Sequence, residues 1–119
     1  MANTELLDRV GRQLVGPQVK PYTLFIRRWL PQYWVFTTES GSSTLLVEKS
    51  GASAAVRGAS PTPDVTVEWV DASLDAALTV ALTHGDRRSI PRSPQPSVKT
   101  HTKKGEDALA FLGRRLGLG

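Results

Sequence analysis

Hydrophobic positions along the first thirty residues recur at helical spacing. Residues 4–15 carry an apolar face formed by Leu6, Leu7, Val10 and Leu14, which is the spacing of an amphipathic helix. Residues 21–30 allow a second, short helix that begins at a proline and places its aromatic side chains on one face. The pattern therefore predicts a helix over 4–15 and a short one over 21–30.

The pattern changes at residue 33. Short segments rich in Val, Thr, Leu and aromatic residues follow, separated by Ser-, Gly- and Pro-rich turns, and we expect strands over 33–39, 44–49, 53–58 and 64–70. The last segment alternates, with Val65 and Val67 on one face and Thr66 and Glu68 on the other, so one face of the sheet should be covered. Consecutive strands joined by short turns predict an antiparallel meander.

The C-terminal half returns to helical spacing. Residues 72–83 predict a helix with Asp71 or Ser73 as its cap and an apolar stripe that includes Leu74, Ala77, Leu78, Ala81 and Leu82. A loop over 85–96, a fifth strand over 97–102 and a last helix over 106–116 follow. The predicted fold class is α+β: one domain over 1–119, with a five-stranded, largely antiparallel sheet and helices packed on one face.

Composition narrows the chemistry. The chain has 119 residues, 39% of them hydrophobic and 22% charged, which is typical of one globular domain. It has no cysteine, so disulfides, thiolate metal sites and cysteine nucleophiles are excluded. The N-terminal segment lacks an apolar core of signal-peptide length, and no apolar run approaches the length of a membrane span. We therefore expect a cytoplasmic protein.

Basic residues concentrate in the last third. Residues 1–83 hold seven Lys/Arg and eight Asp/Glu, whereas residues 84–119 hold eight and three. A net charge of −1 is therefore followed by one of +5, which would suit an anionic membrane surface, an acidic partner or nucleic acid. A solvated surface explains the same charges and is the preferred reading. Nucleic-acid binding is not favoured, because the basic stretches lack interleaved aromatic residues for base stacking.

Two segments resemble the sterol carrier protein type two family. They are Pro63–Trp69 with the following helix 72–83, and Val98–Asp107, which includes a Gly-acid helix start at Gly105-Glu106. The resemblance covers residues 33–116 best. It implies a five-stranded sheet with an apolar tunnel between sheet and helices, and binding of fatty acids, acyl-coenzyme A, sterols or other lipids. The segments 17–32 and 89–96 depart from the family pattern, so the ligand is not identified.

These observations predict a protein that binds and carries a lipid or another hydrophobic metabolite. The residues expected to line the tunnel are Phe25, Trp29, Trp34, Phe36, Leu78, Leu82, Ile90, Phe111 and Leu112. The same aromatic residues could instead simply fill a core, which is the commoner fate. The loop arginines Arg87, Arg88 and Arg92 are expected to flank the entrance and pair with an anionic headgroup.

No motif indicates catalysis, a metal or a cofactor. The two histidines, His84 and His101, lie in different elements and form no ligand pair. No Gly-rich phosphate loop or nucleophile elbow is present. Glu68, Asp71 and His101 are nominal candidates for a buried acid or base. The alternative function is therefore a small enzyme or biosynthetic accessory protein that holds an apolar substrate in the same pocket.

Overall fold

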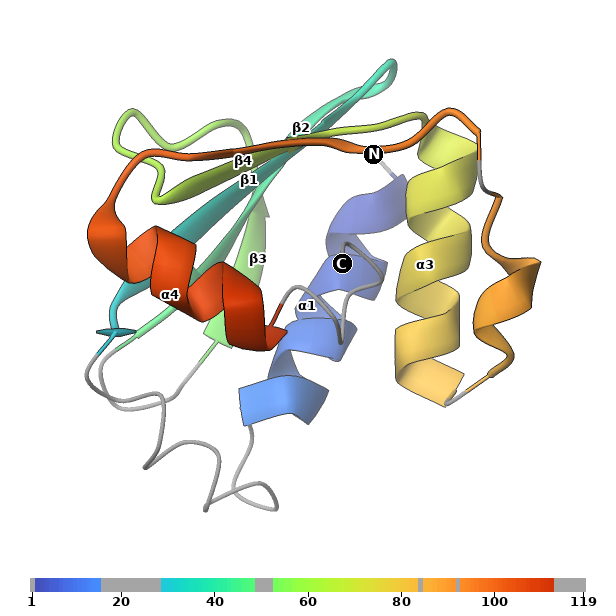
Figure 1. Cartoon of the computed structure of the whole chain (residues 1–119), viewed down its shortest axis with the longest axis horizontal. Coiled ribbons are helices and arrows are strands. Elements are labelled where there is room, and N and C mark those ends of the chain that lie inside the picture. The colour runs from blue at the N-terminus through green and yellow to red at the C-terminus, as the bar shows by residue number, and fades with distance from the viewer. Residues whose placement is uncertain (1, 16–28, 49–52, 84, 92, 113–119) are drawn as a thin grey trace.

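The computed structural model describes residues 2–15, 29–48, 53–83, 85–91 and 93–112. Its elements along the chain are helix α1 (Ala2–Val15), strands β1 (Gln32–Thr38), β2 (Gly41–Val47), β3 (Ser53–Arg57) and β4 (Val65–Glu68), helix α3 (Asp71–Thr83), the 3-10 turn η3 (Arg87–Ser89), strand β5 (Ser97–Thr100) and helix α4 (Lys103–Leu112) (Figure 1). The α+β class and the five strands are confirmed. The short helix predicted over 21–30 lies almost entirely outside the described residues.

The five strands form one mixed sheet in the order β3-β2-β1-β4-β5. β1 pairs antiparallel with β2, β2 with β3, and β4 with β5, whereas β1 and β4 run parallel with Trp34 opposite Val65. The expected four-strand meander is therefore wrong at its third connection. β4 crosses to the far side of β1 instead of pairing with β3, although most pairings remain antiparallel.

The segment between β3 and β4 explains this crossover. Gly58 donates its backbone N–H to the carbonyl of Ser42, and the Thr44 hydroxyl donates to the Gly58 carbonyl and accepts from the backbone N–H of Ser60. These bonds carry the chain back over one face of β2 toward β1, where Asp64 bonds the Tyr33 carbonyl. The proline-containing segment 58–64 is expected from the sequence to be a hairpin turn, but it crosses the face of β2 and leads to β1.

The other face of the sheet, which we call the inner face, holds the core. In register across β1, β2 and β4 it presents Gln32, Trp34, Phe36, Ser43, Leu45, Val47, Val65 and Val67, each less than a tenth exposed. Buried side chains of α1, α3 and α4 pack against it: Leu7, Val10, Leu74, Ala77, Leu78 and Ala108. The prediction that helices cover one face is confirmed.

Helix α3 is apolar over more of its circumference than a surface helix needs to be. It packs against α1 on one side, and η3 contacts it on another (Figure 1). Ile90, directly after η3, is half-buried against the same core. Because α3 is covered on two sides, only a narrow part of its surface meets water and needs polar residues. This explains the mostly apolar sequence Leu-Thr-Val-Ala-Leu over 78–82.

Candidate functional site

The inner face and the helices over it bring several of the predicted ligand-binding residues together. Trp34, Phe36 and Leu78 are each 2% exposed or less and belong to one apolar cluster. Trp29, Leu82 and Ile90 are half-buried and pack at its edge. These six side chains form a continuous apolar layer, which can fill a core or receive an apolar ligand.

The remaining predicted residues are less well defined. Phe25 and Arg92 lie outside the described residues. Phe111 and Leu112 form the end of α4, and Arg87 begins η3, but only their backbone positions are described. Their predicted roles stay predictions.

Arg88 lies away from the inner face. Its guanidinium pairs at 3.0 Å with the carboxylate of Asp86, the residue before η3. The η3 turn lies beside α3 rather than between the helices and the sheet (Figure 1). Hydrogen bonds from the Arg88 side chain and backbone hold the pKa of Asp86 below its usual value of 3.8. The pair is exposed, so Arg88 would have to leave Asp86 to bind a headgroup.

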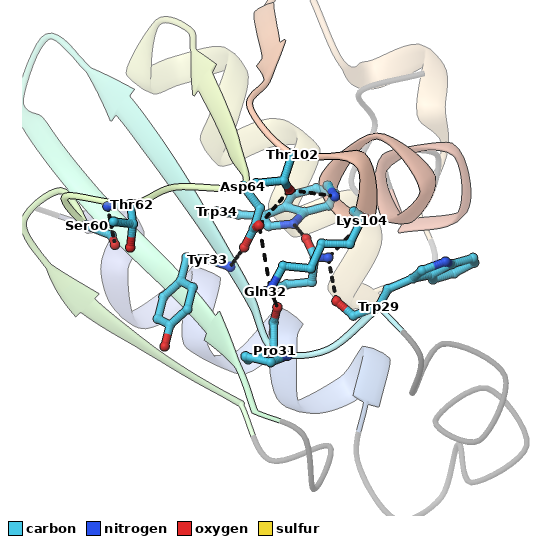
Figure 2. Close-up of polar contacts among 11 residues, drawn as sticks. Trp29, Pro31, Gln32, Tyr33, Trp34, Ser60, Thr62, Asp64, Thr102 and Lys104 are labelled. Atoms are coloured by element: carbon cyan, nitrogen blue, oxygen red, sulfur yellow. Dashed lines mark hydrogen bonds and ion pairs between the residues drawn. The ribbon is translucent and has the colours of Figure 1, made fainter.

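A buried polar cluster joins the beginning of α4 to the sheet (Figure 2). Asp64 is 2% exposed, and it accepts hydrogen bonds from the Tyr33 backbone at 2.9 Å and from the Thr102 hydroxyl at 2.7 Å. Its carboxylate also lies 3.8 Å from the Lys104 ammonium, which donates to the Pro31 carbonyl at 2.7 Å. The carboxylate therefore ties β1, β4 and the first turn of α4 together.

Gln32 completes this cluster from the inner face. Its amide nitrogen donates to the Trp29 carbonyl at 2.7 Å and to the Lys104 carbonyl at 3.0 Å, and its amide oxygen accepts the Trp34 indole N–H at 2.8 Å. Figure 2 shows the Trp29 ring pointing away from the cluster. Because the amide makes three bonds inside the protein, it is an anchor for Trp34 and α4 rather than a free ligand for substrate.

Sequence reasoning missed this cluster, although two signals point to it. Gln32 is a polar residue at the start of the apolar strand β1, and Asp64 is an acidic residue directly before β4. The parallel pairing of β1 with β4 places both at the same end of the sheet. Gly105 belongs to the same contact, because a Cβ there would lie 2.5 Å from the Asp64 carbonyl oxygen.

None of the three nominal acid–base candidates is buried. Glu68 and His101 are exposed, Asp71 is half-buried at the start of α3, and His101 bonds the Thr66 hydroxyl at 2.8 Å. Among the described residues, the buried carboxylate is that of Asp64. Within the described residues, no group of three or more His, Cys, Asp or Glu side chains could hold a metal ion.

A small hollow reaches the core beside the β1–β2 turn. It is lined by Leu7, Phe36, Thr38, Ser40, Gly41, Ser43 and Leu74, and its volume is about 10 Å³. Such a volume holds roughly one water molecule.

In the portion of the chain that the structure describes, no helix is both long and apolar enough to cross a membrane.

Comparison with known proteins identifies the fold. No protein-family profile matches the chain, and no curated protein matches it significantly. The structure is similar to one described as "UbiJ-SCP2 Ubiquinone synthesis protein", with a TM-score of 0.61, 13% sequence identity and 96% of each chain covered. This chain therefore has an SCP2-like fold, that of sterol carrier protein 2.

Two further structures are similar at a TM-score of 0.49. The apo form of sterol carrier protein 2 from Yarrowia lipolytica is 16% identical over 97% of this chain and 92% of that one. The inverting sec-alkylsulfatase Pisa1 from Pseudomonas sp. is 19% identical over 81% of this chain and 14% of that one.

Proposed function

We propose that this protein binds a lipid or another apolar metabolite between the inner face of its sheet and helices α1, α3 and α4. The observation that carries the proposal is the apolar layer of Trp34, Phe36 and Leu78 on an SCP2-like fold. Binding would be sequestration: apolar ligand surface gains about 25 cal/mol for each Å² removed from water. The proposed lining also includes Phe25, Trp29, Leu82, Ile90, Phe111 and Leu112.

A lipid needs far more room than the hollow beside the β1–β2 turn provides. Ligand pockets usually enclose roughly 300–1,000 Å³. We infer that the ligand occupies an apolar tunnel that forms as the helices part from the sheet. The carrier role would then be release of the ligand to a membrane, for which the basic last third of the chain supplies attraction.

The loop arginines are the proposed contact for an anionic headgroup. Arg88 would exchange its ion pair with Asp86 for a bidentate pair with a carboxylate or phosphate. The test is Arg88→Gln, with affinity measured for palmitate and for hexadecanol. A headgroup contact weakens palmitate alone, whereas unchanged affinity for both ligands assigns Arg88 to the η3 turn only.

A panel titration tests the binding proposal itself. Dansyl-labelled undecanoic acid, displaced by fatty acids, sterols and prenylated quinones, should show saturable binding of one ligand per chain. Trp34 lies in the proposed wall, so its fluorescence should change with the same midpoint. Failure of every ligand to bind would reject the proposal.

A second candidate is a biosynthetic accessory protein that presents an apolar intermediate to an enzyme. It is favoured by the likeness to a structure described as a ubiquinone synthesis protein. Preference in the panel separates the two functions. Tighter binding of prenylated aromatic compounds than of acyl chains supports the accessory role, and the reverse order supports a lipid carrier.

A further inference from the structure

The hollow beside the β1–β2 turn is where the apolar core comes close to the protein surface. Its floor consists of Leu7, Phe36 and Leu74, none of them more than 2% exposed. The other residues that line the hollow are short: Thr38, Ser40, Gly41 and the buried Ser43. Ser40 and Gly41 are exposed to solvent. Short residues, three of which bear a hydroxyl, therefore separate the core from water at this point.

Side-chain hydrogen bonds fasten both neighbouring helices to this hairpin. The hydroxyls of Thr4, in the first turn of α1, and Ser43, on β2, are hydrogen-bonded to each other. The Glu39 carboxylate accepts the backbone N–H of Asp71, at the start of α3, at 2.8 Å. The two helices pack against each other with their first turns near the hairpin (Figure 1). The hollow is thus framed by three elements that are joined by polar contacts.

The opposite end of the sheet is fastened differently. There the buried carboxylate of Asp64 and the amide of Gln32 make several bonds to the first turn of α4. A bond between two neutral hydroxyls is weaker than bonds to a buried charged group. Separation of the first turn of α1 from the β1–β2 hairpin therefore requires the loss of a weaker polar contact than separation of α4 from the sheet. The next turn of α1 stays fastened to β3, because the Asp8 carboxylate accepts the Ala55 backbone N–H at 2.9 Å.

We propose that this hollow is the closed entrance to the inner apolar layer, and that the Thr4–Ser43 hydrogen bond holds it shut. The inference rests on the proposed function, since it concerns the route of the same apolar ligand. Leu7 lies one helical turn after Thr4, so displacement of the first turn of α1 moves Leu7 away from Phe36 and Leu74. An apolar chain would then meet these three side chains first, with its polar end left at the hydroxyl-bearing residues of the hollow.

An engineered disulfide tests the entrance directly, because the chain has no cysteine of its own. The variant is Thr4→Cys with Ser43→Cys, where the two hydroxyls already touch. The matched control is Thr37→Cys with Ser42→Cys. These hydroxyls are 2.8 Å apart on the same hairpin, and their strand positions point away from the inner face. Circular dichroism checks that each variant is folded.

Stopped-flow uptake and release of dansyl-labelled undecanoic acid is then measured with each variant oxidised and reduced. If the Thr4–Ser43 disulfide closes the entrance, the oxidised variant should take up and release the ligand at least about tenfold more slowly. Its equilibrium Kd should stay unchanged, because both rates fall together. Reduction should restore both rates, and the control disulfide should change neither rate.

Two outcomes overturn different claims. Equal rates for the oxidised Thr4–Ser43 variant and the control reject the entrance while the binding proposal stands. Absence of uptake by the unmodified protein rejects the proposed function and the entrance with it. Ser43→Ala is an independent variant that needs no disulfide: it should accelerate uptake and release several-fold, whereas Ser42→Ala should not. Unchanged rates in Ser43→Ala also reject the role of the hydrogen bond.

Discussion

Replacement of Asp64 by asparagine tests whether the buried polar cluster anchors α4. The substitution keeps the size of the side chain and removes its charge. The Tyr33 N–H then bonds a neutral acceptor, and the Thr102 hydroxyl must accept from the new amide while it also accepts the Gly105 N–H at 3.0 Å. Lys104 loses a partner at 3.8 Å.

The magnitude follows from these contacts. Hydrogen bonds to charged groups contribute about 1.5–3 kcal/mol each, and neutral ones about half as much. The Lys104 side chain is 38% exposed, so solvent screening limits its ion pair with Asp64 to less than about 1 kcal/mol. We expect Asp64→Asn to lower the free energy of unfolding by about 2–3 kcal/mol. For a chain of this length that corresponds to a fall in Tm of roughly 10 °C.

Urea denaturation followed by tryptophan fluorescence measures this change. The midpoint should fall while the slope m stays constant, because the surface exposed on unfolding is unchanged. Asp86→Asn is the matched control: it removes an exposed carboxylate that also has a cationic partner, and its midpoint should stay close to that of the unmodified protein. If Asp64→Asn lies within about 0.5 kcal/mol of the unmodified protein, the cluster does not anchor α4.

Three further predictions follow from local geometry. Gly105→Ala should lower the free energy of unfolding by about 1–3 kcal/mol, because the new Cβ would lie 2.5 Å from the backbone oxygen of Asp64. Gly11→Ala should lower it less, because the atom 2.7 Å from its new Cβ is the end of the flexible Leu45 side chain. Thermal melts compare the two variants. Ser53→Ala should be neutral or stabilising by up to about 1 kcal/mol in urea denaturation, because its buried hydroxyl has no hydrogen-bond partner among the residues that the structure describes; a clear loss of stability would contradict this. The Asp86 pKa should lie below 3.8 in an NMR titration and should rise in Arg88→Gln. Because the pKa of Asp86 is lower in the folded protein than in the unfolded chain, its ion pair stabilises the fold at pH values above the unfolded-state pKa. This stabilisation is lost as the pH falls through the folded-state pKa.

Much of the fold could be predicted from local patterns. The helix expected over 72–83 is observed at Asp71–Thr83, and the strand expected over 33–39 at Gln32–Thr38. Helical and strand periodicity record which face of an element is buried, and that information is local. The order of strands is not local, so the pairing of β1 with β4 could not be predicted from turn residues between β3 and β4.

Errors at element ends have identifiable physical causes. The last helix begins at Lys103, three residues before its predicted start, because the Thr102 hydroxyl caps it and accepts the Gly105 N–H. β2 begins at Gly41 rather than residue 44, since the serines expected in a turn pair with β1 as far as Thr38. For the same reason, the hydroxyls of Ser42 and Ser43 lie on a strand and not in a loop.

The candidate site was predicted only in its apolar part. Trp34, Phe36 and Leu78 could be assigned to one layer because apolar spacing marks buried faces. The roles of Gln32 and Asp64 depend on a parallel pairing between segments thirty residues apart, which composition and periodicity do not encode. The Thr4–Ser43 contact is equally non-local.

The central claim is that an apolar ligand lies between the inner face of the sheet and the helices. Intermolecular NOEs between a bound apolar ligand and methyl-labelled protein test it most directly. The account predicts NOEs from the ligand to the methyl groups of Leu7, Val67 and Leu78, which are buried in that layer, and none to Val56, which is 56% exposed on β3. NOEs to Val56 with none to the three buried residues would place the ligand on the outside of the sheet and contradict the account.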